Sequence, residues 1–522
     1  SFVGCHEQAQ GTGRPSPALA ALREASPLTE WFGPPRVFDF EREVQPVLDR
    51  HCVECHDGSQ PTAADFRSEA DGGRVTPKPI GYVARLHPDM RRATGGRMRY
   101  TPAYDQLIHY IRRPGIEDDV SILTPGEYHA DTSELVQLLQ KGHHGVRLDA
   151  GEWDRLVTWI DLNGPCHGTW GDVFPIPDGV HERRMELRAQ FGGPGDDPER
   201  VVAGPALAVN PAERIEVSRP EPVVLDDWPL DKRTAREARR SLGETSCEVA
   251  VTKELRLPLV RVPAGRFVMG DVHGEPDEFP QRVVEIDAPF WIGAHEVSNA
   301  LYRVFDPSHD SGYYTKRRDR PDGKGLSLDG DRQPAVRVSR EQALAFCGWL
   351  SERIGAQVTL PTEEQWEYAC RAGTATPLSH GSTDDDFSQR ANMADRLFST
   401  GLANAKGRMM PEGGTTQVSG GVPHLLLEGA ELADRRFADG FRVTAPTGSF
   451  RPNRWGLHDM HGNAAEWTLG THRESGECHV RGGSFADRPE RCRSSFRLRY
   501  PEWQRVFNVG FRVVCHQHPR GD

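Results

Sequence analysis

The sequence predicts a multidomain protein in which an all-α domain near the N-terminus precedes a C-terminal domain of short elements and many loops. The chain has 522 residues, which is more than one hydrophobic core usually supports. Apolar residues recur at helical spacing in the N-terminal third, from Phe40 onward. In the C-terminal half Gly, Pro and Asn are frequent and few segments are periodic, which indicates ordered loops.

Changes in composition and periodicity divide the chain into four parts. Residues 1–37 form an N-terminal segment, 38–170 the helical domain, 171–251 a connecting segment and 252–516 the C-terminal domain. The connecting segment contains a run from Gly192 to Pro222 that is rich in Gly, Pro and charge and has no clear period, as in linkers. We assign this segment no chemistry.

Charge and hydropathy exclude some classes of partner. Lys and Arg total 64 against 76 Asp and Glu, and no basic cluster with interleaved aromatic residues stands out, so nucleic acid is not an expected partner. No stretch approaches the roughly 18 apolar residues of a membrane span. No signal peptide is recognisable after Ser1, so we expect any export signal to be removed or to lie upstream.

One tight cysteine pair carries the strongest chemical signal. Residues 52–56 read Cys-Val-Glu-Cys-His, a C-x-x-C-H motif in which two thiols attach to haem and the adjacent imidazole binds its iron. The alternative is a zinc or redox pair beside a chance histidine, but a zinc site needs a second ligand pair and no other C-x-x-C occurs. We predict that Cys52, Cys55 and His56 hold haem c.

Helices are expected on both sides of this motif. The helix that the motif ends has apolar residues at i, i+4, i+7 and i+8, namely Phe40, Val44, Val47 and Leu48. A helix after Thr132 is marked by Leu135, Leu138 and Leu139. Asp149 and Glu152 form a capping box for a third helix, closed by Gly164, whose expected buried face is Trp153, Leu156, Val157 and Ile160.

The loop from Lys141 to Val146, just before that last helix, contains two histidines. Small cytochromes c place the distal iron ligand in such a loop, and histidine stands here in place of the usual methionine. We predict bis-histidine ligation by His56 and either His143 or His144, with His144 the first to test. The reduction potential should be low, because methionine ligation raises it.

The segment from Phe38 to Trp170 resembles the haem domains of large bacterial proteins related to the hydrazine synthase catalytic subunit. The resemblance implies electron transfer with a redox partner protein, and export to the periplasm or cell surface, where haem c is attached. Cys5 and His6 look like the remainder of a second C-x-x-C-H site that lacks its first cysteine. They bind a second haem, are a vestige, or pair with groups such as Cys166 and His167.

Six motifs follow one another in the C-terminal half. They are Phe267-Val268-Met269-Gly270, Glu296-Val297-Ser298-Asn299, Leu360-Pro361-Thr362-Glu363, Gly456 to Trp467, Arg481-Gly482-Gly483-Ser484 and Gly510-Phe511-Arg512. Their order resembles that of the formylglycine-generating enzyme superfamily. The resemblance implies an α+β fold related to C-type lectins, with short sheets, two main helices and many ordered loops. Capping boxes of Ser339 with Gln342 and Thr362 with Gln365 mark those two helices.

The same resemblance implies calcium, whose preferred ligands are carboxylate and carbonyl oxygens. One site matches Asp459, Gly462, Ala464 and Glu466. A second matches Asn392, Met393, Asp439 and Phe441, with Met393 and Phe441 acting through their carbonyls. The alternative is that Asp459 and Glu466 only cap or hydrogen-bond turns.

The family's copper chemistry is not expected here, because copper(I) is held by two cysteines. Counting from Ser484, these two positions hold Asp487 and Cys492. Ala465 stands where the enzymes have a tryptophan in the substrate groove, whereas Ser484 and Asn508 keep pocket positions. Ser484, Cys492 and Asn508 are therefore only weak catalytic candidates. Five cysteines of this half could form disulfides in an oxidising compartment, namely Cys347, Cys370, Cys478, Cys492 and Cys515.

Three functions follow as alternatives. The chain is an electron-transfer cytochrome whose C-terminal domain is a binding or docking module. Alternatively, the C-terminal domain is a catalytic oxidoreductase that exchanges electrons with the haem. In the third alternative it is a C-type-lectin-like binder of a peptide or other ligand, since a fold does not fix an activity.

Overall fold

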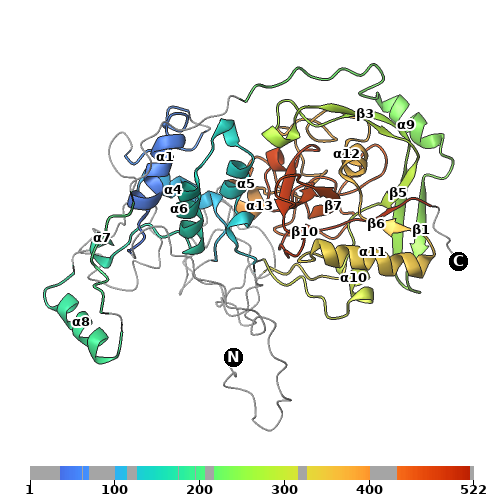
Figure 1. Ribbon diagram of the computed structural model, residues 1–522. Coiled ribbons are helices and arrows are strands. Elements are labelled where there is room, and N and C mark those ends of the chain that lie inside the picture. The colour runs from blue at the N-terminus through green and yellow to red at the C-terminus, as the bar shows by residue number, and fades with distance from the viewer. Residues whose placement is uncertain are drawn as a thin grey trace, which may run out of the picture.

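The computed structural model describes residues 36–60, 63–69, 100–114, 126–173, 176–193, 195–205, 217–314, 326–399 and 432–517. Helices make up the N-terminal domain and short sheets with helices make up the C-terminal one, which confirms the predicted order (Figure 1). Cys5 and His6 lie outside the described residues. Within the described ranges, no helix has the length and apolar character needed to cross a membrane.

The N-terminal domain consists of short helices. They are the π-helical turn η2 (Phe40–Val44), α1 (Gln45–His51), α4 (Pro102–Leu107), η3 (Ile108–Tyr110), η5 (Ala130–Thr132), α5 (Glu134–Gln140), η6 (His143–Gly145) and α6 (Ala150–Asp161). As predicted, α1 ends where the cysteine motif begins, with Cys52 as its C-cap. The capping box of Asp149 and Glu152 at the start of α6 is also confirmed.

The core of this domain differs in part from the predicted faces. Trp159 of α6 is fully buried against Phe40, with ring centroids 5.3 Å apart, whereas the predicted Trp153 and Val157 are only partly buried. In α5 the predicted Leu138 is partly exposed. The faces are rotated because buried charged groups also occupy them, such as the ion pair of Arg155 in α6 with Glu43 in η2.

The connecting segment carries more regular structure than predicted. It contains α7 (Trp170–Val173), α8 (Val180–Gln190), α9 (Lys232–Arg240) and β1 (Ser246–Ala250). Asp231 caps α9 by accepting from the amide of Thr234. Figure 1 shows α8 projecting from the body of the protein, and α9 lying on the C-terminal domain. The described parts of the run from Gly192 to Pro222 contain no helix or strand.

The described residues of the C-terminal domain form three sheets. The strands after β1 are β2 (Arg256–Val262), β3 (Gly265–Met269), β4 (Arg282–Ile286), β5 (Phe290–Gly293), β6 (Val358–Thr359), β7 (Ala465–Thr471), β8 (Cys478–Arg481), β9 (Arg497–Tyr500), β10 (Val509–Gly510) and β11 (Val514–Cys515). The five-stranded sheet has the order β1-β2-β5-β11-β6, the four-stranded sheet β10-β7-β8-β9, and β3 pairs with β4. In the four-stranded sheet β9 is therefore an edge strand.

Helices α10 (Asn299–Phe305), α11 (Arg340–Ile354), α12 (Glu363–Arg371) and α13 (Arg396–Ser399), with the 3-10 turns η7 (Pro276–Glu278) and η9 (Pro489–Arg491), complete the domain. The predicted capping boxes of α11 and α12 are both present. The buried face of α11 includes Phe346, which stacks on Tyr302 at 5.5 Å. The five cysteines expected as disulfide candidates are free thiols, so that expectation is wrong.

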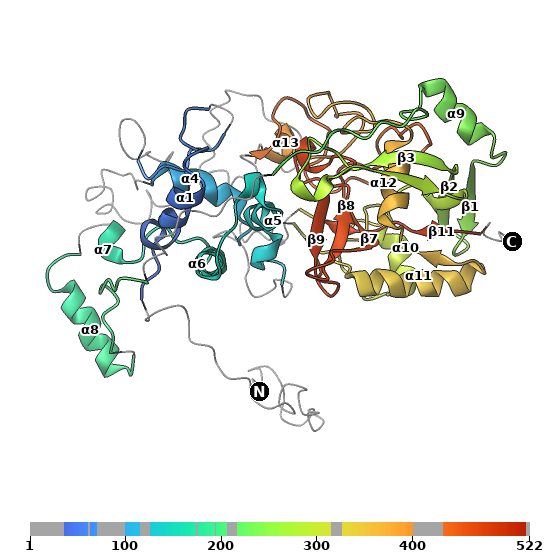
Figure 2. The ribbon, with the colours of Figure 1, turned by 45° about the horizontal axis from the view of Figure 1, so that its top comes forward.

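The two domains contact each other along α5. Figure 2 shows α5 between the helical domain and the edge strand β9. Its position brings residues more than 350 positions apart in the sequence into hydrogen-bond contact, such as Gln137 with Arg499 and Lys141 with Arg497.

Candidate functional site

The cysteine motif forms a tight turn at the end of α1. The amide of His56 donates to the carbonyl of Cys52 over 3.0 Å, so the motif folds back on itself. Cys55 is exposed and Cys52 is half-buried. His56 Nδ1 lies 3.0 Å from the carbonyl oxygen of Ala64. A proton on Nδ1 satisfies this contact and leaves the lone pair on Nε2, the tautomer that a metal-binding histidine needs.

His143 lies opposite His56. Their ring centroids are 6.3 Å apart and their planes differ by 34°. A metal ion bonded to imidazole at about 2 Å lies about 3 Å from the ring centre, so two rings that share an ion are separated by about 6 Å. Burial, with His144 and His56 nearby, lowers the pKa of His143 to about 4, which keeps this imidazole neutral at pH 7. The pair therefore fits haem iron.

His144 has a different environment. It is exposed, its φ of 46° places it in the left-handed region, and its ring packs edge-on against His143 at 4.5 Å. The geometry therefore favours His143, and not His144, as the partner of His56. A neighbouring glycine on each side, Gly142 and Gly145, also has positive φ, which allows this compact turn.

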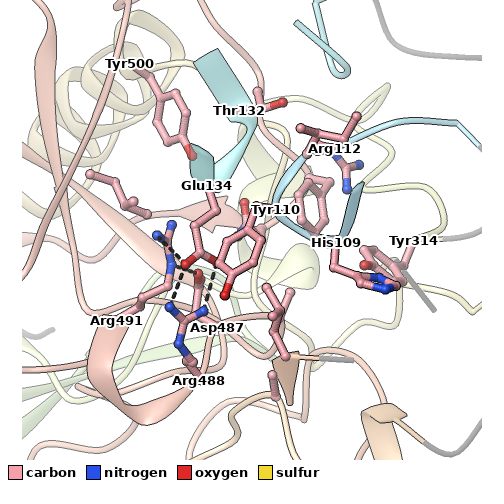
Figure 3. Close-up of a pocket in the computed structure, with 17 residues that line it drawn as sticks. His109, Tyr110, Arg112, Thr132, Glu134, Tyr314, Asp487, Arg488, Arg491 and Tyr500 are labelled. Atoms are coloured by element: carbon pink, nitrogen blue, oxygen red, sulfur yellow. Dashed lines mark hydrogen bonds and ion pairs between the residues drawn. The ribbon is translucent and has the colours of Figure 1, made fainter. Parts of the chain in front are cut away.

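The predicted pocket residues of the C-terminal domain are brought together. Asn508 Nδ2 donates to Ser484 Oγ over 2.8 Å, and Ser484 Oγ donates to Asp487 Oδ2 over 2.7 Å. Asp487 also accepts from Arg491 Nε over 2.8 Å. Asp487, Arg491 and Asn508 border a cavity of about 90 Å³ (Figure 3). The carboxylate of Asp487 is thus held by protein donors.

Cys492 does not complete a copper site. Its side chain is fully buried in an apolar cluster, which consists of Leu378, Phe387, Ala391, Met393 and Cys492. Burial and the nearby charge of Asp487 raise the pKa of the Cys492 thiol well above its usual value. A single buried thiol beside a hydrogen-bonded carboxylate does not fit copper(I), which needs two soft thiolates. Ala465, which we expect at the position of the groove tryptophan, is fully buried in β7.

Buried carboxylates surround the first expected calcium site. Glu466 is held by Arg512, through two contacts of 2.7 Å, and by Trp366 Nε1 at 2.7 Å. Asp459 Oδ1 and Glu296 Oε2 are buried and have no hydrogen-bond partner. Burial raises the pKa values of Asp459 and Glu296, and the negative charges of neighbouring carboxylates raise them further. The unpartnered oxygens of Asp459 and Glu296 fit a hard cation such as calcium. Glu296 begins one of the six sequence motifs but was not predicted as a calcium ligand.

The second expected calcium site also has an excess of negative charge. Asp439 accepts from the amides of Met393 and Phe441 over 3.0 and 2.8 Å. Burial and the adjacent Asp395 raise the pKa of Asp439 to about 8. Asn392 Oδ1 is buried without a partner. In the described part of the chain no three His, Cys, Asp or Glu side chains form a ready metal site, so carbonyls would have to contribute.

Three charged residues that line the cavity were not predicted from the sequence, namely Glu134, Arg488 and Arg491. Glu134 of α5 forms ion pairs with Arg488 and Arg491, so the helical domain supplies one wall of the pocket (Figure 3). Arg488 and Arg491 are three residues apart and lie between Asp487 and Cys492, and two arginines at this spacing indicate an anionic partner. The sequence contains nothing that identifies this partner as Glu134.

Comparison with known proteins concerns the C-terminal domain. A family model described as a sulfatase-modifying factor enzyme 1-like domain matches residues 249–517. The formylglycine-generating enzyme of Bos taurus is 30% identical over 252 residues, which are 40% of this chain and 57% of that protein. The enzyme of Mus musculus is 27% identical over 352 residues, covering 56% of this chain and 82% of the relative.

Two further similarities were found. Inactive C-alpha-formylglycine-generating enzyme 2 of Mus musculus is 26% identical over 304 residues, or 49% of this chain and 85% of that protein. The structure of PvdO from Pseudomonas aeruginosa covers 52% of this chain and 99% of its own, with 24% identity and a TM-score of 0.39. The family match confirms the resemblance expected for residues 252–516.

Proposed function

The chain belongs to the family of sulfatase-modifying factor enzyme 1-like domains through residues 249–517, and we propose that this C-terminal domain serves as a binding or docking module. The N-terminal domain, in this proposal, carries a covalently bound bis-histidine haem c and transfers electrons. The observation that carries the proposal is the pair of facing imidazoles, His56 and His143, with ring centroids 6.3 Å apart beside a C-x-x-C-H motif.

Each residue of the haem site has a distinct role. The thiols of Cys52 and Cys55 would anchor the haem, and the carbonyl of Ala64 orients His56 by accepting from Nδ1. His143 would supply the second imidazole to the iron. Haem, when bound, supplies a one-electron couple, whose potential is low when both axial ligands are histidines. The exposure of Cys55 supports an approach of the redox partner protein to this side of the domain.

Loss of the family's oxidase chemistry is the second part of the proposal. In place of the two cysteines that copper(I) needs, this chain has one buried cysteine, Cys492. The carboxylate of Asp487 accepts hydrogen bonds from Ser484 and Arg491. Inactive C-alpha-formylglycine-generating enzyme 2 of Mus musculus supports this proposal, because it is similar in sequence to this chain and is described as lacking the enzyme's activity. Calcium at Asp459 and Glu296, and at Asp439, would neutralise buried charge and stabilise loops.

Location follows from the cofactor. Haem c is attached outside the cytoplasmic membrane in the systems that the N-terminal domain resembles, so we place the protein in the periplasm or at the cell surface. Expression without the haem maturation machinery is expected to yield apoprotein. Full haem loading in the cytoplasm would contradict this location.

The test of the proposal is a metal and haem analysis of protein purified without an affinity tag. We expect one iron and one covalently bound haem per chain, no copper, and a low-spin spectrum in both redox states. A Cys55→Ala variant should lose a thioether bond and shift the haemochrome band, whereas Cys347→Ala, a buried cysteine far from the motif in sequence, should not. High-spin haem, no covalent haem after maturation, or stoichiometric copper would contradict the proposal.

A further inference from the structure

Helix α5 has two faces that contact different domains. Leu135 and Val136 belong to the core of the helical domain. Glu134, Gln137 and the C-cap residue Lys141 are spaced at i, i+3 and i+7, so they lie on a second face of the helix. All three side chains are largely buried, and each contacts the C-terminal domain. A polar helix face that is buried in this way is a specific docking surface.

At the start of α5 the contact is ionic. Glu134 forms a two-pronged ion pair with Arg488, over 2.6 and 2.9 Å, and lies 3.8 Å from Arg491 (Figure 3). Bidentate pairs of this kind hold orientation as well as position. The two arginines line the same pocket as Asp487. Helix α5 therefore contributes Glu134 to one wall of this pocket of the C-terminal domain.

At the other end of α5 the contact is with the edge of a sheet. Gln137 Nε2 donates to the carbonyl of Arg499 over 3.0 Å, and Lys141 Nζ donates to the carbonyl of Arg497. Both carbonyls belong to the edge strand β9, whose outer backbone groups need a partner. Lys141 Nζ also lies 3.9 Å from the centre of the Phe496 ring and 3.5 Å from Asp277.

The buried lysine is two residues before the distal histidine. Lys141 is the C-cap of α5, Gly142 makes a left-handed turn, and His143 follows directly. Because only Gly142 separates the two residues, fixing the position of Lys141 restricts where the imidazole of His143 can lie. We infer that the C-terminal domain acts through Glu134 and Lys141 as a clamp that positions His143 opposite His56. This inference rests on the proposed haem site, and it makes Lys141 a positioning residue.

The first test uses the full haem-loaded chain and the variant Lys141→Met, which keeps the length of the side chain but removes its charge. Carbon monoxide should bind the ferrous haem about tenfold faster, because the small fraction of chains in which His143 is dissociated from the iron rises by a similar factor. The midpoint potential should shift as well. The matched control is Lys232→Met, at an exposed lysine of α9. Lys141→Arg, which retains the charge, should restore both values.

Glu134→Gln tests the other end of the clamp and keeps the experiment decisive if Lys141→Met does not fold. It should change the same two values, whereas Glu237→Gln, at an exposed ion pair of α9, should not. Wild-type carbon monoxide kinetics and potential in every folded clamp variant would overturn the inference.

A second measurement separates the clamp from the haem proposal. Hydrogen exchange of the backbone amides at residues 142–146 is measured in apoprotein, where no iron holds the loop. Faster exchange in Lys141→Met than in Lys232→Met supports the clamp, and equal exchange overturns it. A wild-type chain that never acquires haem overturns the proposed function, while this exchange measurement still decides whether the C-terminal domain holds the loop.

Discussion

His143 and His144 are adjacent in sequence but differ in environment. His143 is partly buried and faces His56, whereas His144 is exposed and has left-handed backbone geometry. We expect His143→Ala to convert the haem to high spin, because no second imidazole then reaches the iron. His144→Ala serves as the matched control and should leave the absorption spectrum low-spin. The opposite pattern would assign the ligand role to His144, the other candidate that the sequence left open.

We predict that Asp487 and Cys492 stand at the two positions at which the enzymes that the C-terminal domain resembles bind copper(I) with two sulfurs. A carboxylate is a hard ligand that copper(I) binds poorly, and burial raises the pKa of the Cys492 thiol well above its usual value. We therefore expect copper-treated protein to form no aldehyde from a cysteine-containing sulfatase peptide, as measured by mass spectrometry. Aldehyde formation that disappears in Cys492→Ser would show this prediction to be wrong.

At the scale of elements, the docking of α5 should depend on pH. Burial alone would raise the pKa of Glu134, but the charges of Arg491 and Arg488 outweigh it and hold the pKa below its usual value of 4.5. A carboxyl group with a lowered folded-state pKa contributes its full stability above the unfolded value and loses it as the pH falls through the folded value. The clamp should therefore loosen in acid.

The measurement is the protection of the amides at residues 142–146, corrected for the intrinsic pH dependence of exchange. Protection should decrease as the pH is lowered below about 4.5, the usual pKa of a glutamate. Glu134→Gln removes the titrating group, so its protection should be lower at neutral pH and vary less in acid. A wild-type profile equal to that of Glu134→Gln would contradict the prediction.

For the whole molecule, calcium should raise stability through the buried carboxylates. A ligand at one hundred times its dissociation constant adds about 2.7 kcal/mol to the free energy of unfolding. We expect a chelator to lower the melting temperature by several degrees, and added calcium to restore it. Asp459→Asn should reduce this response, whereas Asp178→Asn, at an exposed position in the connecting segment, should not. Melting that is indifferent to both chelator and calcium would show that the site assignment is wrong.

Sequence patterns were reliable where a feature depends on nearby residues. The capping boxes of α6, α11 and α12 were predicted because their two members are three positions apart and satisfy each other's backbone groups. In α5 the period failed in part, because the polar Gln137 is buried and donates both to Asp131 of its own domain and to Arg499 of the C-terminal domain.

The sequence by itself determined the order of an all-α domain and an α+β domain, the family of the second domain, and the cysteine motif. Each of these depends on local spacing or on ordered motifs. Only the tertiary structure decided which histidine faces His56, and that Glu134 and Lys141 hold the two domains together. The physical reason is that these contacts join groups more than 80 positions apart, and no local periodicity encodes which distant charge or carbonyl meets a polar side chain.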